Sequence, residues 1–114
     1  MAESYASKPL YYYKNQFTFN NDNATGNIHC FIINNILFVD VTDCVIKKNL
    51  TNGNVICEGL PVNYYVQVML TKRNMNNVPE IHRCKVQGDG KLYVYYDSIP
   101  AAAEQYYGNG FAFN

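Results

Sequence analysis

Alternation of apolar and polar residues, broken at intervals by asparagine and glycine, runs through most of this chain. It is clearest in residues 28–33 and 36–45, two runs separated by the pair Asn34-Asn35. A period of two belongs to a β-strand, in which neighbouring side chains point to opposite faces, and asparagine and glycine suit the tight turns between strands. A helical period appears almost nowhere, so the sequence predicts an all-β fold.

The turn residues divide the chain into about eight short strands. Two pairs of runs predict hairpins, one turning at Asn34-Asn35 and the other at Gly88-Asp89-Gly90. Residues 101–105 are the only stretch of good helix formers and are long enough for one turn at most. Short antiparallel strands with regular turn signals favour a β-sandwich, and we expect one of jelly-roll type. The expected strands are residues 10–19, 28–33, 36–45, 55–57, 64–70, 81–86, 91–96 and 106–113.

The alternation also predicts which side chains face the core. In residues 36–45 the inward set comprises Leu37, Val39, Val41 and Val45. Asp43 breaks the alternation, which indicates a bulge or a bend between sheets. In residues 81–86 the apolar Cys84 and Val86 share a face, so we expect that face to be the buried one.

Length and charge limit the number of domains and the kinds of partner. With 114 residues, 48% of them hydrophobic and 16% charged, the chain suits one compact domain, residues 1–114, in which residues 1–9 form an extended or flexible N-terminal segment. Nine basic and nine acidic residues give no net charge and no basic stripe, which argues against nucleic acid as a partner. No apolar run has the length of a signal peptide or a membrane span, so we expect a soluble protein made in the cytoplasm, with no membrane partner.

Four cysteines are spread along the chain without a C-x-x-C pair, so neither a structural metal nor another cofactor is expected. Each lies in an apolar, strand-like run, where a free cysteine acts as a small buried hydrophobe. Buried free thiols are the favoured interpretation, and at least one disulfide, or a reactive or metal-bound thiol, is the alternative. The four are Cys30, Cys44, Cys57 and Cys84.

Common catalytic patterns are absent from the sequence. It has no G-x-S-x-G, P-loop or H-E-x-x-H motif. His29 and His82 fit packed or surface positions better than the position of a base or a ligand. Asp40 and Asp43 could form the carboxylate pair of a glycosidase, but a solvated strand end is the commoner state of such residues. We therefore expect a protein that is not an enzyme, with a small glycan hydrolase as the least favoured alternative.

Tyrosine is the remaining functional signal. Eleven tyrosines occur, mostly in adjacent groups such as Tyr64-Tyr65 and Tyr106-Tyr107. Because neighbours in a strand point to opposite faces, each group places at least one ring away from the core. Such rings suit subunit contacts, where tyrosine is enriched, or a platform on which sugar rings stack while asparagine side chains bond the hydroxyl groups.

Two segments carry a resemblance to a known class of proteins. Gly53-Asn54-Val55-Ile56 is followed by Leu60-Pro61, and Val86-Gln87-Gly88-Asp89-Gly90-Lys91-Leu92 precedes a final strand. From about residue 26 to residue 113, this order resembles the C-terminal head (receptor-binding) domain of phage tail-fibre and baseplate tip proteins. The resemblance implies a β-sandwich that assembles as a homotrimer at a fibre tip and adheres to saccharides on a bacterial surface. The four cysteines and the absence of tryptophan depart from that pattern.

The preferred hypothesis is therefore a phage or prophage tail-tip adhesin, located in the virion, with bacterial surface saccharides and other tail or baseplate proteins as partners. A structural, trimer-forming fibre or baseplate domain without its own ligand is the alternative. Weak single-site sugar binding would gain from three linked copies. Loops on a rigid scaffold carry specificity, so binding residues are expected in the loop after residue 72 and in the last strand. They are Arg73, Asn74, Asn76, Asn77, Tyr106, Tyr107 and Asn109.

Overall fold

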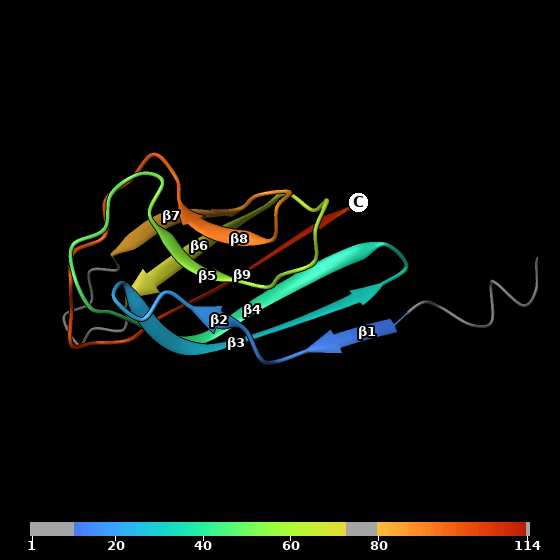
Figure 1. The fold of residues 1–114 in the computed structure, drawn as a ribbon, viewed down its shortest axis with the longest axis horizontal. Helices are drawn as coiled ribbons and strands as arrows, with labels where there is room; N and C mark the ends of the chain where they lie inside the picture. Colours follow the sequence, from blue (N-terminus) through green and yellow to red (C-terminus); the bar gives the residue numbers. More distant parts are fainter. Residues whose placement is uncertain (1–10, 73–79, 114) are drawn as a thin grey trace, which may run out of the picture.

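Nine β-strands make up the regular structure of the residues that the computed structural model describes, 11–72 and 80–113 (Figure 1). No helix occurs within these residues, and residues 101–105, the best helix formers of the sequence, form none. The described residues therefore include no helix long and apolar enough to cross a membrane. The all-β prediction is confirmed. The strands are β1 (Tyr11–Lys14), β2 (Thr18–Phe19), β3 (Ala24–Ile33), β4 (Ile36–Ile46), β5 (Val55–Glu58), β6 (Val66–Lys72), β7 (Ile81–Val86), β8 (Lys91–Val94) and β9 (Tyr106–Phe113).

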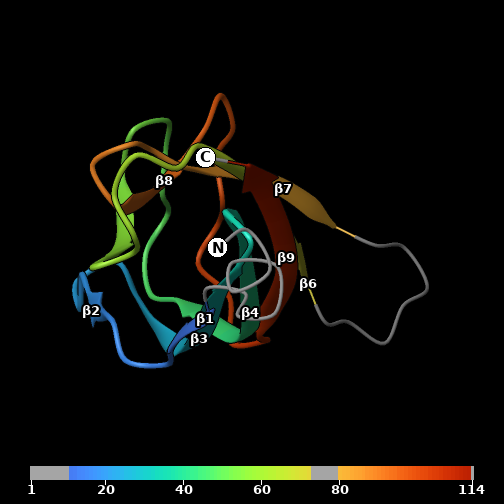
Figure 2. The same ribbon diagram turned by 90° about the vertical axis from the view of Figure 1, so that its right-hand side faces the viewer.

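These strands form one antiparallel sheet, in the order β1-β3-β4-β9-β6-β7-β8-β5-β2. The sheet curls into a half-barrel, which Figure 2 shows along its long axis. Curling brings the two ends of the strand order together, so that β2 and β5 contact β3. The pairing is continuous from edge to edge, and this order does not by itself define a jelly roll.

Both expected hairpins are present. The β3–β4 turn has positive φ angles at Asn34 (51°) and Asn35 (66°), the geometry of a type I′ turn, whose twist matches that of the strands it joins. The β7–β8 turn contains Gly90, with φ 82°. A Cβ atom on Gly90 would lie 2.3 Å from the carbonyl oxygen of Leu60, so this turn packs against the Leu60-Pro61 segment only because the residue is glycine.

The first expected strand, residues 10–19, is divided in two. β1 pairs with β3 at one edge of the sheet, and β2 pairs with β5 at the other. Between them the chain crosses the open side of the half-barrel, where Lys14 Nζ donates a hydrogen bond of 3.0 Å to the carbonyl oxygen of Gly59 and lies 5.2 Å from the centre of the Phe17 ring. Each edge of a curled sheet exposes unpaired backbone groups, and this one segment pairs with both edges in turn.

A hydrophobic core fills the inside of the half-barrel. Three of the four residues predicted to face it from β4 are buried, and Val45 is the exception. The register of β4 against β9 shifts between Val41 and Cys44, which turns Cys44 and Ile46 inward in place of Val45. The shift confirms the irregularity that Asp43 indicated, because a bulge reverses the facing of every residue after it.

All four cysteines are buried and free of disulfides. Cys84 shares the inward face of β7 with Val86, as predicted. Burial raises the pKa of Cys30 to about 11 and those of Cys44 and Cys57 to about 12, so these thiols stay protonated at neutral pH. The interpretation of the cysteines as buried free thiols is confirmed.

An asparagine joins the two ends of the strand order. Asn23, 6% exposed, donates from Nδ2 to the carbonyl oxygen of Val55 at 2.7 Å, and its own carbonyl oxygen accepts from the N–H of Lys47 at 2.8 Å. Nearby, the N–H of Asn20 donates to the carbonyl oxygen of Ile56 at 3.0 Å. These contacts, which we call the asparagine clasp, hold β5 against the segment where β2, β3 and β4 meet.

Candidate functional site

Four of the seven residues predicted to bind a saccharide lie outside the described residues: Arg73, Asn74, Asn76 and Asn77. The other three belong to β9. Tyr107, 42% exposed, and Asn109 point outward from that strand, whereas Tyr106 points into the core. The described part of the chain therefore keeps two of the predicted residues on an accessible face.

The prediction for Tyr106 is wrong. Its side chain has no exposed surface; its hydroxyl donates to Oε2 of Glu80 at 3.1 Å, and its ring packs edge-on against that of His82, with 5.8 Å between the ring centres. One ring of the adjacent pair Tyr106-Tyr107 had to face inward, and it is the first. A ring without an exposed face cannot stack on a sugar. Tyr64 and Tyr65 divide in the same way, at 6% and 62% exposed.

An aromatic row crosses the outer face of the sheet close to Asn109. Phe31 of β3, Phe38 of β4 and Phe111 of β9 are partners in the strand register. The ring centres of Phe31 and Phe38 are 4.9 Å apart and those of Phe38 and Phe111 6.0 Å, with angles of 14° and 28° between the planes. Cross-strand stacking holds the three rings side by side, and Phe111 remains 62% exposed. We call these three residues the phenylalanine row.

A shallow groove of about 410 Å³ lies along the phenylalanine row. Its polar side is formed by Asp40 and Asn109, register partners on β4 and β9 that are two residues along from Phe38 and Phe111. Between the two sets lies Val39, whose side chain points into the core, so that the floor of the groove is largely backbone. The lining residues are Phe31, Phe38, Val39, Asp40, Asn109, Gly110 and Phe111.

The two polar side chains of the groove are available to a ligand. Within residues 11–72 and 80–113, neither Asp40 nor Asn109 has an ion pair or a side-chain hydrogen bond. A carboxylate accepts hydrogen bonds, and an amide both donates and accepts them. Directly opposed cross-strand residues have Cβ atoms about 5 Å apart, so the two groups can bond neighbouring hydroxyls of one ligand while ring edges contact its C–H groups.

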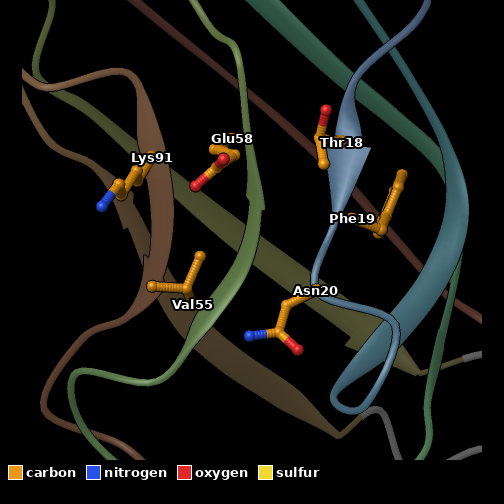
Figure 3. Close-up of a pocket in the computed structure, with 6 residues that line it drawn as sticks. All are labelled: Thr18, Phe19, Asn20, Val55, Glu58 and Lys91. Atoms are coloured by element: carbon orange, nitrogen blue, oxygen red, sulfur yellow. The ribbon is translucent and has the colours of Figure 1, made fainter.

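A second hollow, of about 350 Å³, opens over β2, β5 and β8, at the other end of the strand order (Figure 3). A β-bulge creates it, because the register shift between Val55 and Cys57 turns both Ile56 and Cys57 inward. The outward side chains of Val55 and Glu58 are then three residues apart, about 10 Å along the strand, instead of two. We call this hollow the bulge pocket. Its lining residues are Thr18, Phe19, Asn20, Val55, Glu58 and Lys91.

A charged cluster lies apart from the residues that line the groove and the bulge pocket. His82 has Nε2 2.8 Å from Oε2 of Glu80 and Nδ1 3.3 Å from Oδ2 of Asp97. The hydrogen bond with His82 holds the pKa of Glu80 below its usual range. Burial alone would raise the pKa of Asp97, but hydrogen bonds from the N–H groups of Arg83 and Ser98, together with His82, lower it. The cluster joins β7 to the segment after β8, which is a structural role.

Two alternatives from the sequence can be compared with this geometry. Among the described residues, no three His, Cys, Asp or Glu side chains are placed to hold a metal ion. The carboxylates considered for a glycosidase are not both at the groove: Asp40 lines it, whereas the Asp43 carboxylate accepts from Asn27 Nδ2 at 3.0 Å and is not among the lining residues.

Sequence reasoning missed the phenylalanine row, and it considered Asp40 only as half of a catalytic carboxylate pair with Asp43 and not as a binding residue. A signal was present, because residues 28–33 and 36–39 carry apolar side chains at both odd and even positions. Such a run must present apolar groups on both faces of the strand. It is equally the pattern of a strand buried on both sides, so the sequence alone could not identify the outward face.

No protein-family model matches this chain, and neither curated proteins nor solved structures include a significant match to it.

Proposed function

We propose that this protein is a saccharide-binding adhesin domain of a phage or prophage tail tip, acting on the surface of a bacterial cell. The observation that carries the proposal is the groove beside the phenylalanine row, which combines exposed aromatic carbon with the Asp40 carboxylate and the Asn109 amide, two groups without a side-chain partner among the described residues. The sequence resemblance to phage head domains supplies the biological setting. The proposal takes the curled sheet to correspond to the jelly-roll sandwich of such heads.

A saccharide has the complementary surface. Its ring carries patches of C–H groups, which can leave water and pack against aromatic carbon at little cost in free energy. Its hydroxyl groups need hydrogen-bond donors and acceptors close to that carbon. In the groove, the rings of Phe38 and Phe111 supply the first requirement, and Asp40 and Asn109 supply the second. An open groove with one aromatic wall binds a single sugar weakly, so three copies in a homotrimer would provide the necessary avidity.

Binding to bacterial polysaccharide tests the proposal. Purified protein is applied to arrays of cell-surface glycans, and each glycan that binds is measured again with Asp40→Asn and Phe111→Ala. We expect each substitution to weaken binding about tenfold or more, since each removes a charge-assisted hydrogen bond or a contact face. Asp22→Asn, in an exposed turn, and Tyr96→Ala, at another exposed aromatic, are the matched controls and should bind like the unchanged protein. Equal binding by all four variants would eliminate the groove as the site.

A structural, trimer-forming domain is the second candidate, and one observation favours it. Phe111 and Phe113 are 62% and 70% exposed on the same face of β9, and Met69 on β6, the register partner of Asn109, is 40% exposed. Apolar area of this kind commonly marks a protein contact. Light scattering separates the candidates: a trimer that Phe111→Glu converts to monomers, together with no glycan binding by the unchanged protein, supports the structural role. A trimer that Phe111→Glu leaves intact, in a protein that binds glycan in its unchanged form, supports the adhesin.

A further inference from the structure

The bulge pocket follows from the backbone and does not require an unusual side-chain arrangement. In β5 the sequence Val55-Ile56-Cys57-Glu58 turns its two central residues into the core, and the outer face lacks a side chain where regular alternation would place one. The N–H of Asn20 satisfies the carbonyl oxygen of Ile56 at the bulge, so the gap is held open by the asparagine clasp. Bulges are enriched beside functional sites because they re-aim side chains in this way.

One acidic and one basic residue line the pocket, Glu58 and Lys91. Glu58 and Lys91 are register partners on β5 and β8, and Figure 3 shows the Glu58 side chain extending toward β8 while the Lys91 ammonium group points away from it. Within the described residues neither side chain forms an ion pair or a side-chain hydrogen bond. The pocket thus offers the two acceptor oxygens of Glu58, and the Lys91 side chain lines it. The hydrogen bond from Tyr93 lowers the pKa of Asp89, and the charge of Lys91 lowers it further.

Asn20 adds a donor of fixed direction. Its Oδ1 accepts from the N–H of Asp22 at 3.3 Å, which leaves the Nδ2 group, with both of its hydrogens, on the pocket side. Thr18 contributes a hydroxyl, which both donates and accepts. The lining therefore has hydroxyl, amide, carboxylate and ammonium groups around one hollow, and Phe19 lies on the far side of β2 from Glu58 and Lys91 (Figure 3).

We propose that the bulge pocket is a second, independent binding site for one ring of a neutral saccharide. The lining carries one acidic and one basic side chain, so a charged ligand would be attracted by one and repelled by the other, whereas a neutral polyol can use both. A volume of about 350 Å³ lies at the small end of ligand pockets and suits a single ring. The proposal shares the ligand class of the proposed function but none of its residues.

Nuclear magnetic resonance of the ¹⁵N-labelled protein tests this site directly. Three neutral probes, the methyl α-D-glycosides of glucose, galactose and mannose, are titrated to about 50 mM, because a site with so few contacts should have a Kd of about 1–10 mM. We expect at least one probe to shift the backbone amide signals of Thr18, Glu58 and Lys91 and the side-chain amide of Asn20. Glu58→Gln and Lys91→Met should each raise Kd about fivefold or more, while Asp40→Asn in the groove should leave it unchanged.

Three outcomes would overturn the proposal. It is wrong if none of the three probes moves these signals, or if they move only signals near Phe38 and Phe111, which would retain the groove as the sole site. It is also wrong if glucosamine or glucuronic acid binds the pocket more tightly than the neutral probes do. Glu58→Gln and Lys91→Met act on different strands, so loss of folding in one, seen as collapsed signal dispersion, leaves the other as the test. Shifts at the pocket with an inert groove would refute the proposed function and keep this site.

Discussion

Removal of the Asn23 side-chain amide should open the half-barrel at its clasp. Asn23→Ala deletes the 2.7 Å hydrogen bond to the carbonyl oxygen of Val55 and leaves that oxygen with one partner fewer in a partly buried place. Asn23→Asp keeps the size of the side chain but replaces the donor with an acceptor that faces a carbonyl oxygen. Both variants retain the backbone hydrogen bonds of residue 23 to Asn20 and Lys47.

The magnitude follows from burial. A typical hydrogen bond contributes about 1 kcal/mol net, and a buried acceptor left without its donor costs about 1–3 kcal/mol. Asn23 is 6% exposed, so water cannot easily replace the lost amide, and we expect Asn23→Ala to lower the free energy of unfolding by about 2 kcal/mol. Asn23→Asp should cost about 3 kcal/mol or more at neutral pH, because a charge is then desolvated without a partner.

Urea unfolding followed by intrinsic tyrosine fluorescence measures both values, and a thermal scan should show a fall in Tm of about 6–10 °C for Asn23→Ala. Asn27→Ala is the matched control, since it also removes an asparagine hydrogen bond, 3.0 Å from Nδ2 to Asp43 Oδ2, but at an exposed site. That control should lose about 0.5 kcal/mol or less. If Asn23→Ala and Asn27→Ala cost the same, the clasp does not hold the two ends of the sheet together and the reasoning fails.

Three further outcomes are expected. Gly108→Ala should destabilise the fold by about 3 kcal/mol or more, because the new Cβ would lie 2.0 Å from the Met69 carbonyl oxygen. Gly53→Ala, which meets open space but has φ 89°, should cost about 1 kcal/mol. Urea unfolding compares the two variants, and equal costs would contradict the close approach of Gly108 to β6. The pKa of Glu80 is lowered in the folded state, so its ionised carboxylate stabilises the fold above the unfolded pKa of 4.5, and this stabilisation is lost as the pH falls. The Tm difference between the unchanged protein and Glu80→Gln should therefore shrink between pH 7 and about pH 3. A constant difference would count against a stabilising role of the Glu80 carboxylate. Since the pKa of Cys30 is about 11 and those of Cys44 and Cys57 are about 12, about one of these thiols in a thousand or fewer is ionised at pH 8. Ellman's reagent should therefore label none of the four buried cysteines in the native protein and all four in urea. Immediate labelling of the native protein would show an accessible thiol.

Local pattern was sufficient for the hairpins and for the last strand. The β3–β4 turn needs two residues that accept positive φ, and Asn34-Asn35 supplies them between two alternating runs. The β7–β8 turn likewise has glycine at the position of positive φ, Gly90. These features are decided within a few residues, which is why the sequence alone could predict them.

The arrangement of the edges depends on contacts between distant parts of the chain. Residues 10–19 have the composition of one long strand, and nothing local separates β1 from β2. The division arises because the sheet curls until its two edges lie within reach of a single segment, with β3 available at one side and β5 at the other. Such pairing has a large sequence separation, and alternation carries no information about it.

Glycine placement explains why the accessible face of β9 could not be chosen from its aromatic residues. Tyr106 faces inward while Phe111 faces outward, so aromatic rings occupy both faces of the strand. The inward positions between them are Gly108 and Gly110, where a Cβ atom would lie 2.0 Å and 2.3 Å from carbonyl oxygens of β6. The curl brings the inner side of β9 close to β6, so the inward positions there must be glycine. Side chains that could bind a ligand therefore occupy the outward positions of β9. Two glycines separated by the single residue Asn109 were the signal that Asn109 lies outward, and the meaning of that signal depends on a curl that only the folded sheet displays.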